Sequence, residues 1–214
     1  MLTQVRPDSD VSTAILAAGE RAFAEFGYAG ASMRGIARDA GVNQAMIAYY
    51  FGSKEGLLHA IMRRRSSFVN AQREVLLDNL LAQGQPTVED LIEAFMAPLV
   101  ELGRDEEQGG YSYVRMLAVF MHSVDEVAKR VIAENFDGIA RRFTDAFREI
   151  EPRMTESDAI RAYLLSLGAG IAALGIEGRA KRMSDQYDHP DTARLLRAVV
   201  AFSSAGVRAL MHRD

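Results

Sequence analysis

The sequence contains no cysteine, only four histidines and no long uninterrupted hydrophobic run. Without cysteine there are no disulfide bonds and no thiolate metal or redox sites, and a reducing compartment is acceptable. Charges and glycines interrupt the apolar stretches well before the roughly 20 residues that a bilayer-spanning helix needs, so no membrane helix is expected. The first ten residues lack the basic start and apolar centre of a secretory signal, which favours a cytoplasmic location.

The charge is unevenly distributed along the chain. The 214 residues carry a net charge of −4, yet residues 1–65 hold eight basic and six acidic side chains. The amino-terminal segment is therefore slightly positive and the remainder is acidic, which is a weak indication of an anion-binding head on an acidic body. With 49% hydrophobic residues, the chain is long enough to bury a core in one or two domains.

Apolar residues recur with helical spacing along the chain, whereas the period-two alternation of strands is absent. Ser32 and Asn43 are favourable N-caps, and Gly27 and Gly41 are favourable helix stops. The predicted fold class is therefore all-α, with about nine helices and no sheet. We expect these helices over residues 10–26, 32–40, 43–51, 53–77, 88–102, 111–122, 125–150, 155–181 and 190–211.

The second and third expected helices are short and are joined by a tight turn at Gly41, which is the pattern of a helix-turn-helix. In that motif the second helix enters the major groove of DNA with its first residues on base edges. Its outward face would carry Gln44, which can pair with adenine, Ala45, which allows close approach, and Tyr49, which can reach a phosphate. Tyr50 falls on the same side as Ile47, so simple packing is an equally good interpretation for its ring.

Lys54 lies in the first turn of the next expected helix. The positive end of the helix dipole disfavours a cation there by a few tenths of a kcal/mol, and a nearby phosphate would reverse this effect. The alternative is a solvated surface lysine without a partner in DNA.

The run from Ser32 to Asn43, SMRGIARDAGVN, and the run from Tyr49 to Leu58, YYFGSKEGLL, resemble the DNA-binding signature of the TetR (tetracycline-repressor-like) family of transcription regulators. The resemblance covers roughly residues 12–62. It implies an N-terminal three-helix DNA-binding domain over 1–56 and a C-terminal helical effector-binding and dimerisation domain over 57–214.

The resemblance also implies roles for individual residues. Ser32 and Arg34 approach the DNA backbone or a base, Gln44 and Ala45 read bases, and Tyr49, Tyr50 and Lys54 clamp phosphates. Two positions depart from the family pattern. Many members carry tyrosine where this chain has Ala48, and position 50 is often histidine.

An effector pocket among the middle helices is a further implication of the resemblance. Aromatic and methionine side chains are plentiful there, although each of them alone is more typical of an ordinary core. A pocket of this composition would prefer an apolar or amphipathic molecule. The expected pocket residues are Phe95, Met116, Phe120, Met121, Phe136, Phe143 and Tyr163.

Small residues accumulate in the last two long helices, which suggests that another helix approaches them closely. By resemblance, the approaching helices are the same pair from a second subunit; the alternative is tight packing within one chain. The expected interface residues are Gly168, Ala172, Gly175, Leu195, Val199, Phe202 and Gly206.

The predicted function is a sequence-specific DNA-binding transcriptional regulator, a repressor that a small effector releases from a palindromic operator. Its expected partners are operator DNA, a second copy of the chain and an unidentified small molecule, with no membrane, metal or cofactor. A helical protein-interaction module without DNA binding and a small helical enzyme remain as alternatives. The glycine-rich run 168–173 lacks a preceding strand, and the histidines have no metal-ligand spacing, so neither supports an enzyme.

Overall fold

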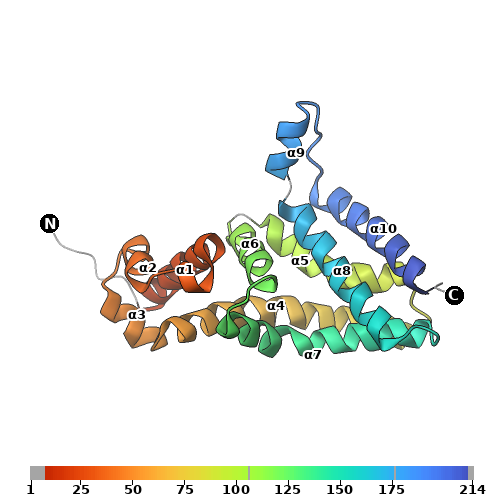
Figure 1. The fold of residues 1–214 in the computed structure, drawn as a ribbon, viewed down its shortest axis with the longest axis horizontal. Coiled ribbons are helices and arrows are strands. Elements are labelled where there is room, and N and C mark those ends of the chain that lie inside the picture. Colours follow the sequence, from red (N-terminus) through yellow and green to blue (C-terminus); the bar gives the residue numbers. More distant parts are fainter. Residues whose placement is uncertain (1–7, 106, 176, 212–214) are drawn as a thin grey trace. The chain divides into compact units, whose positions relative to one another are not determined.

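The computed structural model describes residues 8–105, 107–175 and 177–211, and helices account for most of them (Figure 1). No strand occurs within these ranges, so the prediction of an all-α fold is confirmed. The helices are α1 (Asp8–Gly30), α2 (Met33–Ala40), α3 (Gln44–Phe51), α4 (Lys54–Gln83), α5 (Val88–Arg104), α6 (Gly110–Met121), α7 (Glu126–Ile150), α8 (Glu156–Gly175), α9 (Glu177–Met183) and α10 (Thr192–Met211).

The described ranges contain ten helices, one more than the sequence indicated, because the segment expected as one helix over 155–181 forms two. α8 ends at Gly175 and α9 begins at Glu177, with residue 176 between them outside the described residues. Gly175 and Gly178 flank this break, and each glycine weakens a helix interior by roughly 0.5–1 kcal/mol. The continuous hydrophobic spacing of the segment concealed the interruption.

Gly27 interrupts α1, as its position after the apolar stripe predicted. Its φ of 66° and ψ of −178° are not helical, so the chain bends there and continues for another turn to Gly30. The φ is positive, but the ψ differs from that of the expected left-handed cap.

The chain forms two compact units. The first contains the residues up to Ser66 together with Arg115–Asn135, and the second contains Ser67–Val114 together with the residues from Phe136 onward. The boundary predicted between residues 56 and 57 divides the chain by expected function, whereas these two units are defined by contacts within each of them. The predicted boundary therefore stays a prediction.

The core of the first unit joins α1 to α2, to the first turns of α4 and to α6. Phe23 is fully buried, and its ring lies 6.2 Å from that of Phe120. Gly19 permits close approach of α1 and α4, because a Cβ at this position would lie 2.8 Å from Ile61 Cδ1. Other buried residues of this core are Ile15, Ile36, Ile47, Leu57, Leu58 and Met62.

A buried ion pair also connects α1 to α4 in the first unit. Arg65 donates from Nε to Glu20 Oε2 at 2.8 Å and from Nη2 to Glu20 Oε1 at 3.0 Å. The two side chains are only 13% and 7% exposed. Paired in this two-bond geometry, both charges keep hydrogen-bonding partners after losing water.

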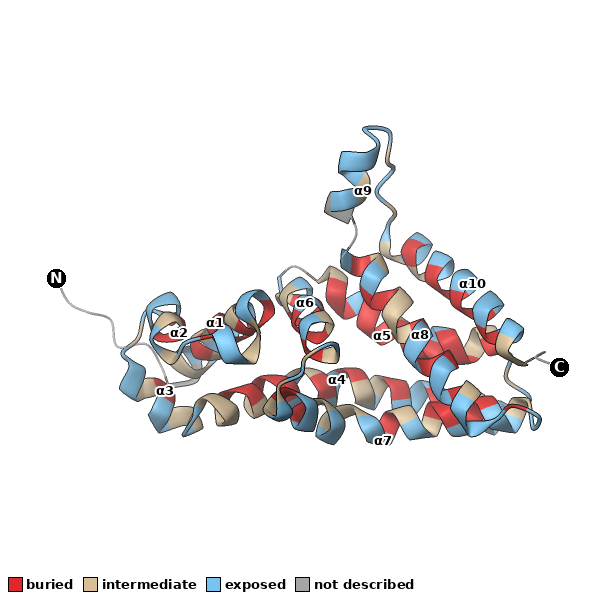
Figure 2. Cartoon of the chain, in the orientation of Figure 1, coloured by how far each residue is buried: buried red, intermediate tan, exposed pale blue. Residues whose placement is uncertain are grey.

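The core of the second unit is built on α5, which contacts both α8 and α10. Buried residues cover most of α5 and follow one side of α10 (Figure 2). α5 begins with a capping box, in which Thr87 Oγ1 accepts from Asp90 N at 3.1 Å and Asp90 Oδ2 accepts from Thr87 N at 2.8 Å. This cap fixes the start of the helix that organises the unit.

α8 is, by length and composition alone, the one helix in the described part of the chain that qualifies as a membrane span. The charges and glycines along the chain had led us to expect no helix of this kind. Seven of its residues, among them Tyr163 and Ile171, are buried against the same unit, and the helix contacts α5 and α10. α8 therefore packs one face into the second unit, and this packing is how we interpret its apolar residues.

Candidate functional site

The turn between α2 and α3 is fixed by three local interactions. Ser32 caps α2, with Oγ accepting from Gly35 N at 3.0 Å, and Asn43 caps α3, with Oδ1 accepting from Met46 N at 3.0 Å. Gly41 ends α2 in the left-handed conformation, with φ 69° and ψ 33°. Caps and turn therefore lie where the sequence predicted them, and together they set the direction in which α3 leaves α2.

α3 divides into a buried side and an exposed side. Ile47 is fully buried, whereas Gln44, Ala45, Ala48 and Tyr49 are exposed, and the Tyr49 side chain is 78% exposed. The outward face predicted for this helix is therefore exposed.

Tyr50 occupies an intermediate position on α3. Tyr50 is half-buried, and its ring meets the Tyr49 ring edge-on, with the two centroids 5.1 Å apart. The centroid of the Phe51 ring lies 6.1 Å from that of Tyr50. The packing interpretation and a contact with a phosphate are both compatible with a ring that is partly covered.

Lys54 is held against the first unit rather than extended into solvent. Its Nζ donates to the carbonyl oxygen of Ala29 at 3.3 Å and lies 4.7 Å from the centroid of the Tyr28 ring. Partial burial lowers the pKa of Lys54, and the charge of Asp125 opposes this shift. The ammonium group is thus positioned at the start of α4, where Ser53 Oγ accepts from Gly56 N at 3.0 Å.

Tyr28 has a part in the site that sequence reasoning did not assign to it. The available signal was an aromatic residue directly after the Gly27 bend, within the residues 12–62 that the resemblance covers. Spacing along one helix could not connect it with Lys54, because the two residues are far apart in the sequence.

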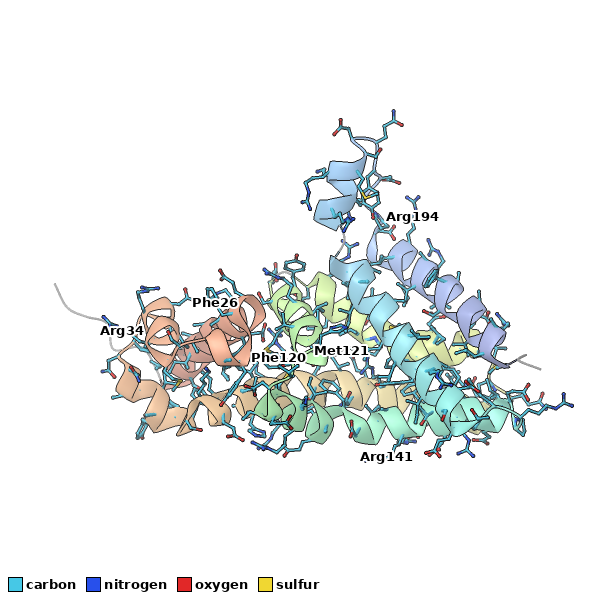
Figure 3. All side chains as sticks on the ribbon, in the orientation of Figure 1. Phe26, Arg34, Phe120, Met121, Arg141 and Arg194 are labelled. Atoms are coloured by element: carbon cyan, nitrogen blue, oxygen red, sulfur yellow. The ribbon has the colours of Figure 1, made fainter. Side chains whose placement is uncertain are left out.

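α2 adds exposed positive charge beside α3. Arg34 and Arg38 are exposed, and they line a hollow of about 470 Å³ together with Ser32 and Gln44. Figure 3 shows Arg34 at the outer side of α2. Arg38 was missed, although its spacing of four residues from Arg34 places both on one helix face.

Asp39 does not cancel this positive charge, because it is paired elsewhere. Arg21 donates to Asp39 Oδ2 from Nη2 at 2.6 Å and from Nε at 3.1 Å, which ties α1 to α2. The surface formed by Ser32, Arg34, Arg38 and the exposed side of α3 therefore offers cations, hydrogen-bonding groups and two helix starts to an anion.

The seven residues predicted to line an effector pocket fall into two groups. Phe95, Phe143 and Tyr163 lie together in the second unit, with the Phe95 ring 5.3 Å from Phe143 and 4.5 Å from Tyr163. Phe136 is half-buried in the same unit. Met116, Phe120 and Met121 belong to the first unit, where Met116 and Phe120 are buried and Met121 is half-buried. Figure 3 labels Phe120 and Met121 on α6.

Arg73 lies beside the first of these groups and was missed. It is 2% exposed, and its guanidinium carbon is 4.4 Å from the centroid of the Phe95 ring. The signal was present in the sequence, because Val69, Arg73 and Leu77 follow one another at intervals of four, so the arginine falls on an apolar stripe.

The residues predicted for the dimer interface differ in their exposure to solvent. A Cβ added at Gly168, Gly175 or Gly206 would meet no atom within 4 Å, so these glycines do not serve packing within the described chain. Phe202 is 74% exposed, and Ala172 is also exposed. Leu195 and Val199 are buried, yet both line a surface hollow of about 460 Å³ with Ala172 and Phe202.

No group of three or more histidine, aspartate or glutamate side chains within the described ranges is arranged to hold a metal ion.

Two family models match the chain. The model described as "Bacterial regulatory proteins, tetR family" matches residues 15–61, and the one described as "Tetracyclin repressor-like, C-terminal domain" matches residues 93–206. The first match contains the α2–α3 surface and the start of α4. The second covers more than half of the chain.

Individual proteins support the same relationship. The HTH-type transcriptional regulator BetI of Escherichia coli is 28% identical over 173 residues, which are 78% of this chain and 80% of that protein. BetI 2 of Chromohalobacter salexigens is 46% identical over 59 residues, 26% of this chain and 28% of that protein. A TetR-like regulator of a Rhodococcus species has the same fold, with a TM-score of 0.63, 15% identity and coverage of 95% of this chain and 99% of that one.

The geometry of the turn generates a prediction about stability. Gly41→Ala should destabilise the protein by about 1–2 kcal/mol, because a Cβ disfavours the left-handed conformation even though no neighbouring atom obstructs it. Gly138→Ala is the matched control, since a Cβ there also meets no atom within 4 Å but lies inside α7. The control should stabilise by roughly 0.5–1 kcal/mol. Urea unfolding of the three proteins measures both changes, and equal effects of the two substitutions would contradict the conformational explanation.

Proposed function

This chain belongs to the tetR family of bacterial regulatory proteins, and from that premise we propose that it is a homodimeric repressor which a small effector releases from a near-palindromic operator. DNA-binding regulation of transcription is the activity of the family, so the chain is a regulator and not an enzyme. Since that activity requires DNA, the interaction module without DNA binding is not favoured. The observation that carries the detailed proposal is the exposed face of α3.

Base recognition is assigned to the start of α3. Gln44 is exposed there, and its amide can donate to N7 and accept from N6 of one adenine. Ala45 is exposed and small, which allows the helix to approach the groove or to touch a thymine methyl group.

Phosphate binding is assigned to the residues around that face. Ser32 and Arg34 lie at the start of α2, Tyr49 and Tyr50 near the end of α3, and Lys54 at the start of α4. Lys54 is already oriented by Tyr28 and the Ala29 carbonyl, so less side-chain entropy is lost when it meets a phosphate. We add Arg38, which shares the exposed hollow with Arg34.

Dimerisation is assigned to α8 and α10. Exposed Phe202, the open glycines and the shallow hollow between these helices support a contact with the same surface of a second copy. A two-fold symmetric dimer would place its two α3 helices about one DNA turn, roughly 34 Å, apart on a palindromic site.

Release from DNA is assigned to an effector that binds the region 57–214. Such a molecule lowers operator affinity only to the extent that it binds the DNA-incompetent conformation more tightly than the competent one. Because the target is operator DNA, we infer that the protein works in the cytoplasm.

Lys54→Ala should weaken binding to all duplexes by a similar factor and reduce the slope of log affinity against log salt by about one, because one phosphate contact is lost. Fluorescence anisotropy at several salt concentrations measures both quantities. Lys129→Ala, an exposed lysine on α7 that pairs with Glu126, is the control and should leave the slope unchanged. A changed base preference with an unaltered slope would rule out the phosphate assignment.

Gln44→Ala should remove the preference for one base in each half-site and cost on the order of 1–3 kcal/mol on the cognate operator. Selection of bound sequences from random duplexes, with wild type and variant in parallel, gives both profiles. A near-palindrome selected by the wild type tests the function itself. Identical profiles for the two proteins would show that Gln44 does not read a base.

Phe202→Glu should dissociate the dimer, because it places two charges in an apolar contact, while the fold survives since this side chain is 74% exposed. Light scattering reports the mass of the particle, and far-ultraviolet circular dichroism checks the fold. Val75→Glu, at a side chain on α4 that is 60% exposed, is the matched control and should stay dimeric. A dimeric Phe202→Glu protein would place the interface elsewhere.

A further inference from the structure

Arg73 is a buried cation in the aromatic part of the second unit. It projects from α4, is 2% exposed, and donates from Nε to the carbonyl oxygen of Phe95 at 2.8 Å. Its Nη1 lies 3.5 Å from Asn70 Oδ1, at the limit of a hydrogen bond. Its Nη2 has no hydrogen-bonding partner among the described residues.

The charge of Arg73 is poorly compensated by these contacts. Arginine keeps its proton under physiological conditions, so it cannot avoid the desolvation cost by becoming neutral. Burial lowers the pKa of Arg73 without changing this conclusion. The attraction between the guanidinium and the face of the Phe95 ring is weaker than the cost of removing one ion from water.

The first unit shows how the same fold compensates a buried arginine. Arg65 is 13% exposed and meets both carboxylate oxygens of Glu20. No carboxylate within the described ranges forms such a pair with Arg73. An anion from outside the chain would supply what Glu20 supplies to Arg65.

The surroundings of Arg73 indicate the rest of such a molecule. The Phe95 ring contacts the guanidinium of Arg73 and also the rings of Tyr163 and Phe143. All three aromatic residues are buried. These are three of the predicted effector residues. Burial raises the pKa of Tyr163, so its hydroxyl stays protonated and able to donate to an anion.

We propose that the effector is an organic carboxylate with an apolar body, whose carboxylate binds Nη2 of Arg73 and whose apolar part lies against Phe95, Phe143 and Tyr163. The proposal rests on the proposed function, because it identifies the chemical class of that effector. A single negative charge matches the single guanidinium. A phosphate dianion would bring a second charge into the core without a partner, which is unfavourable because a buried unpaired charge loses its hydration.

Binding at this position requires a rearrangement of the second unit. Because Arg73 is 2% exposed, an anion reaches it only when the helices around it separate. The anion would therefore favour a conformation that differs from the one described here, which is the condition for an effector to alter affinity at another site. Arg73 lies on the helix whose first residue is Lys54.

The test compares straight-chain and phenyl-substituted carboxylates with alcohols of the same carbon skeleton, using thermal shift and operator release by the full-length protein. Carboxylates should raise the melting temperature of the wild type more than the matched alcohols do. Arg73→Met should weaken carboxylate binding by roughly 10- to 100-fold, the worth of a hydrogen bond to a charged group, and leave the effect of the alcohols unchanged. Arg141→Met is the control, at an exposed arginine on α7 that Figure 3 labels.

Without ligand, Arg73→Met should melt at the same temperature as the wild type or higher, because it replaces an uncompensated buried charge by an apolar chain. It should still bind operator DNA but no longer release it with carboxylate. A large loss of stability in Arg73→Met, equal effects of alcohols and carboxylates, or no shift from any carboxylate of the series would each overturn the proposal. Failure of the wild type to select an operator would instead refute the proposed function, because the thermal shift does not depend on DNA.

Discussion

The surface proposed to face DNA depends on the burial of Ile47 in the middle of α3. This helix is only eight residues long, too short to be stable in isolation, so contacts with α2 and the core of the first unit maintain it. With Ile47 inward, the helical repeat turns Ala45 and Tyr49 to the opposite side, and Gln44 in the first turn is also exposed. The left-handed turn at Gly41 then fixes the angle at which that face is presented.

The two buried arginines show how the same charge serves different purposes. Arg65 closes a two-bond pair with Glu20 and thereby joins helices that are distant in the sequence. Arg73 has a carbonyl, a weak amide contact and an aromatic face, but no charge partner within the described ranges. Retaining an uncompensated cation in a core reduces stability, and binding of an anion is a physical reason for retaining it.

Local features of the first unit were predictable because they depend on neighbours in the sequence. Ser32 and Asn43 cap their helices through backbone groups three residues away, and Gly41 adopts a conformation that other residues disfavour. The position of Lys54 against Tyr28 was not predictable, since it depends on how α1 and α4 meet. The break between α8 and α9 was missed because hydrophobic spacing continues across the glycines that flank it.

The sequence by itself determined the all-α class, the helix-turn-helix and the outward face of α3, because helical periodicity and capping are interactions over three or four residues. Only the tertiary structure decided which charges are paired and which aromatic residues meet. In the second unit, three helices bring Phe95, Phe143 and Tyr163 together beside Arg73. In the first unit, the ring of Phe120 packs against that of Phe23. Such contacts depend on how helices pack in space, and one chain's periodicity carries no information about that arrangement.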